Sequence, residues 1–173
     1  KKAAKQIRSG ADNLYLDMGN SGTGMRLMAG FIAGLGIDAE LVGDESLSNR
    51  PMERIAKPLR EMGAEIHLKE GKPPIKIAKS NIADEFIYDL EIPSAQIKSC
   101  LLLAALSAGT KIKIIEKETT RNHTELLLQH LDADLAVKKS NGETEIILDA
   151  TKPITAKDVF VPGDFSSAAF LIG

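Results

Sequence analysis

Leu14-Tyr-Leu-Asp-Met-Gly-Asn-Ser-Gly-Thr-Gly-Met-Arg26 is the stretch that decides the fold, because it predicts an apolar strand, a small polar turn and the opening of a helix. The same plan returns at Leu90-Glu-Ile-Pro-Ser-Ala-Gln-Ile-Lys-Ser99 and at Val159-Phe-Val-Pro-Gly-Asp-Phe-Ser-Ser-Ala168. A serine opens each predicted helix, and these serines, at positions 21, 94 and 166, lie 73 and 72 residues apart. A fixed period of this kind indicates a repeated supersecondary unit.

Hydrophobic periodicity extends this plan into two units of order β-α-β-α-β-β, at about residues 14–80 and 86–150. In the first unit we expect strands at 14–18, 39–42, 65–68 and 75–78 and helices at about 23–34 and 51–63, with residues 43–50 and Pro73-Pro74 in loops. In the second unit we expect strands at 86–92, 111–115, 134–138 and 143–148 and helices at 94–107 and about 122–131. The predicted fold class is therefore α+β, a mixed α/β arrangement. Because parallel crossovers are right-handed, both helices of a unit should lie on one face of its sheet.

The composition is that of an ordinary globular domain of 173 residues, of which 43% are apolar and 27% charged. The formal net charge of −2 argues against a nucleic-acid partner, which would require a basic surface. No apolar stretch is long enough to span a bilayer, and the first residues do not resemble a secretion signal. We therefore expect a cytoplasmic protein without a membrane partner. Cys100 follows a helix start in an apolar run and is expected to be a buried structural thiol.

The third copy of the plan stops at Gly173, inside its predicted helix. An apolar helix that ended at this point would lack most of the packing partners of its apolar stripe. We therefore expect this chain to be a fragment of a longer protein.

Each predicted helix opening consists of residues with small or hydroxyl side chains, so the first backbone N–H groups stay accessible. The positive end of such a helix is suited to bind an anion. Ser, Thr and Asn are also good helix caps, and a capping role alone would explain any single motif. However, an arginine repeats almost in step with the serines, since Arg50 lies 29 residues after Ser21 and Arg121 lies 27 residues after Ser94. This repetition favours anion binding.

Arg50 and Arg121 both precede a predicted helix, at the end of a loop. A guanidinium group in this position can bind a phosphate or a carboxylate with two parallel hydrogen bonds. The alternative is that each arginine pairs with an acidic neighbour on the surface, for which Asp44, Glu45 and Glu125 are candidates.

Histidines and acidic residues indicate no further site. His67, His123 and His130 lack Cys or acidic partners at the spacing of metal ligands, so no metal is expected. The Asp and Glu residues are mostly spread singly over predicted exposed faces, so no carboxylate pair can be assigned as catalytic acid and base. We therefore assign no catalytic residue within this chain.

Five motifs together resemble a known enzyme family in their order and spacing. They are Leu16-Asp-Met-Gly-Asn-Ser-Gly-Thr-Gly-Met-Arg26, Gly43-Asp-Glu-Ser-Leu-Ser-Asn-Arg-Pro-Met52, Pro93-Ser-Ala-Gln-Ile-Lys-Ser99, Thr120-Arg-Asn-His-Thr-Glu125 and Val161-Pro-Gly-Asp-Phe-Ser-Ser-Ala-Ala-Phe170. The family they resemble is that of 3-phosphoshikimate 1-carboxyvinyltransferase, also called EPSP synthase. The resemblance covers nearly the whole chain.

The resemblance implies an enzyme of two lobes, each with three such units, whose helix openings converge on the cleft between the lobes. Residues 1–160 would then belong to one lobe, and residues 161–173 would begin the crossover to a second lobe of the same chain. The family transfers the enolpyruvyl group of phosphoenolpyruvate to the 5-hydroxyl of shikimate 3-phosphate and releases phosphate. This reaction belongs to the shikimate pathway of aromatic amino acid biosynthesis, and no cofactor is implied.

The resemblance also implies the site residues, motif by motif. Those expected to bind phosphoenolpyruvate are Asn20, Gly22, Thr23, Arg50 and Gln96. Those expected to bind shikimate 3-phosphate are Ser94, Ala95, Gln96 and Arg121. The residues that move protons would lie outside this chain, so we expect the fragment alone to be inactive.

Two alternatives stay open from the sequence. UDP-N-acetylglucosamine 1-carboxyvinyltransferase shares the fold and the chemistry, but it typically carries a reactive cysteine before the arginine-proline pair, and residues 44–49 contain no cysteine. RNA-binding modules with a similar unit are the second alternative, and the charge balance argues against them.

Overall fold

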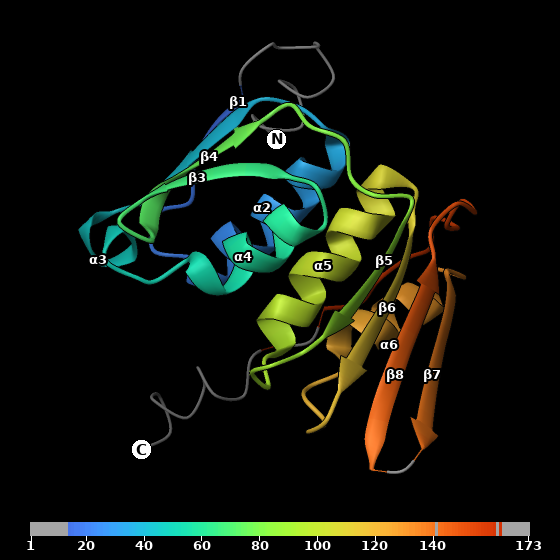
Figure 1. Cartoon of the computed structure of the whole chain (residues 1–173). Helices are drawn as coiled ribbons and strands as arrows, with labels where there is room; N and C mark the ends of the chain where they lie inside the picture. Colours follow the sequence, from blue (N-terminus) through green and yellow to red (C-terminus); the bar gives the residue numbers. More distant parts are fainter. Residues whose placement is uncertain (1–13, 141, 162, 164–173) are drawn as a thin grey trace.

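The computed structural model describes residues 14–140, 142–161 and 163, and it contains two successive copies of one arrangement (Figure 1). The first copy consists of β1 (Leu14–Asp17), α2 (Gly22–Leu35), β2 (Ala39–Val42), α3 (Glu45–Ser48), α4 (Glu53–Glu61), β3 (Glu65–Lys69) and β4 (Lys72–Ala78). The second consists of β5 (Glu85–Asp89), α5 (Ala95–Ala108), β6 (Lys111–Glu116), α6 (His123–His130), β7 (Asp134–Ser140) and β8 (Glu143–Asp149). The predicted elements of both units are therefore present, with α3 as an addition.

Each unit forms a four-stranded sheet, and the two sheets have equivalent strand orders, β1-β2-β4-β3 and β5-β6-β8-β7. In both sheets the first two strands are parallel and the other neighbours are antiparallel. Figure 1 shows α2 and α4 on the same face of the first sheet, as the handedness of the crossovers predicts. The predicted mixed α/β fold class is confirmed.

Residues 43–50 were expected to form a loop, but they contain the one-turn helix α3. The Leu47 N–H donates a hydrogen bond to the Asp44 side chain at 2.8 Å, and the Leu47 side chain is fully buried. A side-chain cap and the burial of one leucine are thus enough to form a turn of helix that is too short to show apolar periodicity. Pro51 lies outside the next helix, which begins at Glu53 and not at the predicted position of the proline.

Pro73 and Pro74 lie inside β4 and not in the predicted hairpin loop. The loop is the turn at residues 70–71. Pairing of β4 with β2 begins only at Ile75, and the register of β4 against β3 shifts at the same end. Because proline has no N–H to donate, it fits this irregular end of the strand.

The third copy of the strand-turn-helix plan lies mostly outside the described residues. Ser166 and the helix predicted after it belong to residues 164–173, which the structure does not describe. Residues 159–161, expected to form the strand of this copy, are described and lie in no helix or strand. In the second copy, β5 ends at Asp89, three residues earlier than predicted.

α2 and α5 pack side by side and join the two units (Figure 1). A Cβ added to Gly30 would lie 2.1 Å from the Cys100 carbonyl oxygen. A Cβ added to Gly34 would lie 2.1 Å from the Ala104 carbonyl oxygen, so only residues without a side chain allow the helices to come this close. Both contacts join residues 70 positions apart, so the helices run in the same direction and their N-terminal ends lie together.

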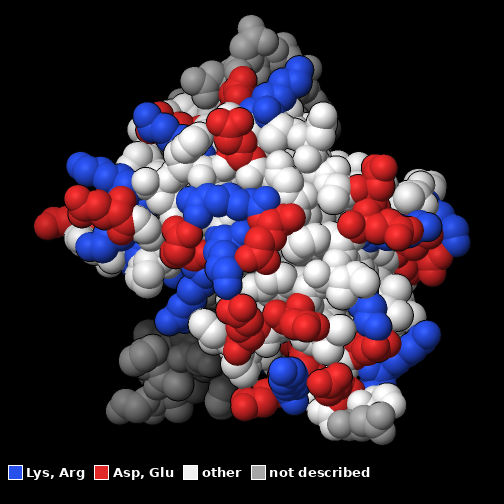
Figure 2. Space-filling model, viewed as in Figure 1, with Lys and Arg blue, Asp and Glu red and all other residues white. Residues whose placement is uncertain are grey.

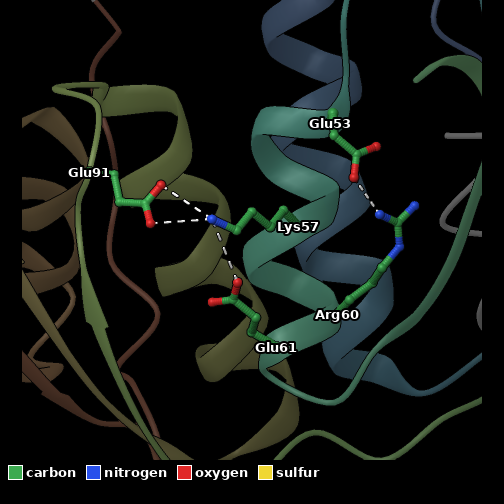
Figure 3. Close-up of polar contacts among 5 residues, drawn as sticks. All are labelled: Glu53, Lys57, Arg60, Glu61 and Glu91. Carbon is green, nitrogen blue, oxygen red and sulfur yellow. Dashed lines mark hydrogen bonds and ion pairs between the residues drawn. The ribbon is translucent and has the colours of Figure 1, made fainter. Parts of the chain in front are cut away.

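An exposed ion pair also connects the two units (Figure 3). Lys57 Nζ of α4 lies 3.2 Å from the carboxylate of Glu91, which precedes α5, and 4.0 Å from that of Glu61. Glu53 and Arg60 form a second pair within α4. The Lys57 and Glu91 side chains are 51% and 66% exposed, and an ion pair in water contributes only about 0–1 kcal/mol. The close packing of α2 against α5 therefore contributes more than the ion pair to holding the units together.

The surface carries both signs of charge. Acidic and basic side chains are interspersed over the face in Figure 2, where neither sign covers a large continuous area. Within the described part of the chain, no helix combines the length and the apolar character needed to cross a membrane.

Candidate functional site

Ser21 and Ser94 cap the first turns of α2 and α5. The Ser21 hydroxyl accepts a hydrogen bond from the Gly24 N–H at 3.0 Å, and the Ser94 hydroxyl accepts one from the Ile97 N–H at 3.4 Å. Both serines therefore act as the caps that their residue type predicts. The Gly22 N–H donates to the Asn20 carbonyl at 3.1 Å. The remaining first-turn N–H groups, those of Thr23, Ala95 and Gln96, have no partner inside their own helix, so they can bind an anion.

Gln96 of α5 joins the openings of the two helices. Its Nε2 donates a hydrogen bond to Thr23 Oγ1 at 2.7 Å, and its Oε1 accepts one from Arg26 Nη1 at 3.0 Å. Thr23 and Arg26 are three residues apart and share one face of α2. Residues about 70 positions apart in the chain therefore meet at a single polar side chain.

Asn20 holds Arg50 beside the opening of α2. Arg50 Nη2 donates to Asn20 Oδ1 at 2.7 Å, and Asn20 Nδ2 donates to Asp44 Oδ2 at 2.7 Å. Hydrogen bonds from the Leu47 N–H and then from the Asn20 amide, together with the positive charge of Arg50, lower the pKa of Asp44. Among the ion pairs between described residues none involves Arg50, because the Asn20 amide lies between Arg50 and Asp44.

Gly22 lies against two guanidinium groups. A Cβ added to it would lie 2.9 Å from Arg50 Nη1 and 3.2 Å from Arg26 Nη1. Burial, and then the nearby positive charges of Arg50 and Arg54, lower the pKa of Arg26. Two positive groups gathered around a residue without a side chain form a place where an anion can approach both the arginines and the helix backbone.

A cavity of about 230 Å³ adjoins Thr23 and Gln96. Its lining residues come from α2, α5 and the segment around the start of α6, and they are Thr23, Leu27, Ala95, Gln96, Ser99, Arg121, His123 and Thr124. Glu125, the acidic neighbour considered for Arg121, instead pairs with Lys98 at 2.6 Å. Among the described residues Arg121 takes part in no ion pair, so its charge is available to a ligand in this cavity.

Known proteins share this sequence pattern and this fold. A family model described as EPSP synthase (3-phosphoshikimate 1-carboxyvinyltransferase) matches residues 1–173. The chain belongs to the EPSP synthase family. This membership confirms the resemblance seen in the five motifs, and it favours the EPSP synthase family over the two alternatives.

Individual members of the EPSP synthase family match only over part of their length. The 3-phosphoshikimate 1-carboxyvinyltransferase of Hydrogenovibrio crunogenus is 48% identical over 159 residues, which cover 91% of this chain and 36% of that protein. The one from Streptococcus thermophilus is 47% identical over 157 residues, or 90% of this chain and 36% of that protein. A solved structure of EPSP synthase from Acinetobacter baumannii has a TM-score of 0.75 and 43% identity, over 94% of this chain and 36% of that chain. The chain thus spans little more than a third of the length of these relatives.

Most of the residues implied by the EPSP synthase resemblance lie at the two helix openings. Those that line the cavity are Thr23, Ala95, Gln96 and Arg121. Those that form the adjoining guanidinium cluster are Asn20, Gly22 and Arg50. Ser94 also lies at an opening, as the cap of α5, but it is not among the residues that line the cavity.

Arg26 and His123 belong to the site, although the sequence analysis did not assign them. Arg26 lies four residues after Gly22, and that spacing could have identified it, because residues four apart share a helix face. His123 lines the cavity together with Arg121, but only the fold reveals this. In the described ranges, no group of three or more His, Cys, Asp or Glu side chains could hold a metal ion.

Cys100 is fully buried between the helices, as predicted. Burial raises the pKa of its thiol to about 12. The reactive form of a cysteine is the thiolate, which this burial disfavours.

Proposed function

We propose that this chain supplies substrate-binding groups to an enzyme that transfers the enolpyruvyl group of phosphoenolpyruvate to the 5-hydroxyl of shikimate 3-phosphate. One observation carries the proposal: Gln96 joins two helix openings that both have arginines beside them. Both substrates carry a phosphate, and helix openings with guanidinium groups bind phosphates. Family membership and the names of the bacterial relatives support this reaction, which belongs to the biosynthesis of aromatic amino acids.

We assign phosphoenolpyruvate to the opening of α2. This substrate has a phosphate and a carboxylate, and Arg26 and Arg50 offer two guanidinium groups against Gly22. Because Gly22 has no side chain, an anion can reach the first-turn amides and both arginines together. The proposed ligands are those implied by the resemblance, with Arg26 added: Asn20, Gly22, Thr23, Arg26, Arg50 and Gln96.

We assign shikimate 3-phosphate to the adjoining cavity of about 230 Å³. Arg121 supplies charge from the loop before α6, and Ala95 at the opening of α5 leaves the first-turn amides accessible. Ser94 shapes this opening as its cap. Gln96 contacts the α2 opening and also lines the cavity, so it lies between the two proposed substrates.

The reaction needs proton transfer in addition to binding. The methylene carbon of phosphoenolpyruvate must gain a proton, and the 5-hydroxyl must lose one as its oxygen bonds to the enolpyruvyl carbon. Phosphate then leaves as its bond to that carbon breaks, and the new methyl group loses a proton to restore the double bond. The groups described here bind and orient, which brings the reacting atoms to about 3–3.5 Å. We propose that a second lobe of the same protein supplies the acid and base, so that this chain alone is inactive. The expected cytoplasmic location stays a prediction that cell fractionation tests.

Calorimetric titration of the whole enzyme tests the assignment of Arg121. Arg121→Ala should weaken the binding of shikimate 3-phosphate by about 1.5–3 kcal/mol, the range for a hydrogen bond to a charged group. Lys57→Met removes an exposed cation of α4 and should leave the affinity unchanged. Wild-type affinity in an Arg121→Ala enzyme that circular dichroism shows to be folded would refute the assignment. Failure of the unaltered enzyme to bind shikimate 3-phosphate would refute the function.

A further inference from the structure

Lys98 is a buried cation that the proposed chemistry does not use. It is fully buried, and its Nζ lies 3.0 Å from Glu116 Oε1 and 2.6 Å from Glu125 Oε1. Both carboxylates are buried as well. Among the described residues neither Lys98 Nζ nor Glu125 Oε2 has a hydrogen-bond partner of suitable geometry, so the two ion pairs alone hold Lys98 in place. Burying three charges costs several kcal/mol each before they attract one another, and apolar residues in such places are often as stable. Stability alone therefore does not explain this cluster.

The three charged residues come from three elements next to the loop that carries Arg121. Lys98 lies one turn after Ser94 in α5, and its N–H donates to the Ser94 carbonyl at 3.2 Å. Glu116 is the last residue of β6, and Glu125 lies in the first turn of α6. Residues 117–122 connect β6 to α6 and carry Arg121. Lys98 thus ties both ends of the Arg121 loop to the helix that presents Ala95 and Gln96.

Two further contacts hold the same loop. Thr120, the residue before Arg121, donates from its hydroxyl to Glu116 Oε1 at 2.6 Å. Ser99, next to Lys98, shares a hydrogen bond with Thr124 at 2.7 Å between their hydroxyl oxygens. Glu116 Oε1 therefore pairs with Lys98 and also accepts the hydrogen bond from Thr120, the residue adjacent to Arg121.

We propose that Lys98 is a positioning residue for Arg121 in the site for shikimate 3-phosphate. An ammonium group is a compact point charge, so it can attract carboxylates from two elements at once. Without it, two buried carboxylates would face each other and repel, and the loop between them would shift. Arg121 makes no ion pair of its own among the described residues, so its place in the cavity wall depends on this loop. The inference rests on the proposed function, because that function assigns the phosphate of the substrate to Arg121.

The test is a double-mutant cycle in the whole enzyme, with the dissociation constant of shikimate 3-phosphate measured by calorimetry. Thr120→Val cuts the link to Glu116 but leaves the three charges in place, and it should weaken binding about threefold to tenfold. Lys98→Met should weaken binding by a larger factor. In an Arg121→Ala enzyme, each substitution should change the affinity less than twofold, because the residue it positions is gone. Lys57→Met is the control and should have no effect in either background.

Amide hydrogen exchange of residues 117–122 supplies a measurement that needs no substrate. It should become faster in Thr120→Val and Lys98→Met and stay unchanged in Lys57→Met. If Lys98→Met does not fold, Thr120→Val still tests whether Glu116, a carboxylate that pairs with Lys98, fixes the Arg121 loop, and wild-type affinity and exchange in this variant would overturn the inference.

Three outcomes would overturn the inference: wild-type affinity in the folded variants, equal losses with and without Arg121, or unchanged exchange of the loop. If the unaltered enzyme does not bind shikimate 3-phosphate, the proposed function fails. In that case the exchange experiment still decides whether Lys98 fixes the loop.

Discussion

Replacing Gly34 by alanine should destabilise the protein, because α2 and α5 touch through their backbones at this residue. The new Cβ would lie 2.1 Å from the Ala104 carbonyl oxygen and 2.1 Å from Ser107 Oγ. The serine hydroxyl can rotate away, but the carbonyl belongs to the backbone of α5 and can yield only if the helices separate. Ser107 also donates a hydrogen bond to the Phe31 carbonyl at 2.7 Å, and separation would weaken this link between the helices.

Three contributions set the size of the effect of Gly34→Ala. Overpacking of a filled interior costs about 1–3 kcal/mol. Weakening the hydrogen bond of Ser107 adds roughly 0.5–1.5 kcal/mol. Alanine is the better helix former and returns about 1 kcal/mol relative to glycine. The free energy of unfolding should therefore fall by about 0.5–3.5 kcal/mol in total.

Urea denaturation followed by circular dichroism measures this change. The unfolding midpoint of Gly34→Ala should fall, and adding Ser107→Ala should restore only a small part, since the carbonyl contact remains. Lys57→Met, on the exposed side of α4, serves as the control with a nearly unchanged midpoint. An equal or higher midpoint for Gly34→Ala would show that helix propensity outweighs packing here, and the argument that the two backbones are in tight contact would be wrong.

Three further predictions concern the site. In the whole enzyme, Arg50→Ala should reduce transition-state stabilisation by roughly 2–5 kcal/mol, because the bound anion loses its counter-charge. Arg50→Lys should restore only part of this stabilisation. An unchanged specificity constant in Arg50→Ala would exclude a binding role for Arg50. Gly22→Ala should weaken phosphoenolpyruvate binding by about 1 kcal/mol or more, because the alanine Cβ would lie 2.9 Å from Arg50 Nη1. Calorimetry measures this change, and unaltered affinity would show that the anion does not approach Gly22. The purified chain alone should release no phosphate from phosphoenolpyruvate with shikimate 3-phosphate, and steady turnover would contradict the assignment of acid and base to a second lobe.

Signals that act within a few residues made much of the fold predictable from the sequence. Ser21 begins α2 with its own hydroxyl as the cap, and Gly36 ends it with a φ of 62° that glycine adopts without strain. The 73-residue spacing between Ser21 and Ser94 corresponds to two sheets of equivalent strand order. Each of these features depends on residue type and spacing alone, so no knowledge of tertiary contacts was needed.

Features that depend on packing between distant segments were not predictable in this way. Two adjacent prolines at 73 and 74 predicted a loop, but they lie in an irregular strand end that accepts them. Pairing of β4 with β2 and β3 creates this irregular end, and the local sequence does not reveal it. Arg26 has a role only because α5 brings Gln96 beside it. Lys98 lies within an apolar helix sequence, and the two carboxylates that make its burial possible come from elements 18 and 27 residues further along the chain.

The side chains that orient Arg26 and Arg50 are amides, and because an amide is neutral, the positive charge of the site is preserved. Gln96 accepts from Arg26 and Asn20 accepts from Arg50, so each guanidinium is fixed in place by a neutral oxygen. A carboxylate in either position would make a stronger hydrogen bond, but it would also neutralise the arginine and cancel its attraction for a ligand. α2 and α5 present their positive ends at the same place, which adds to the repulsion among these groups. An anion bound there relieves that repulsion, so its binding should also stabilise the packing of α2 against α5.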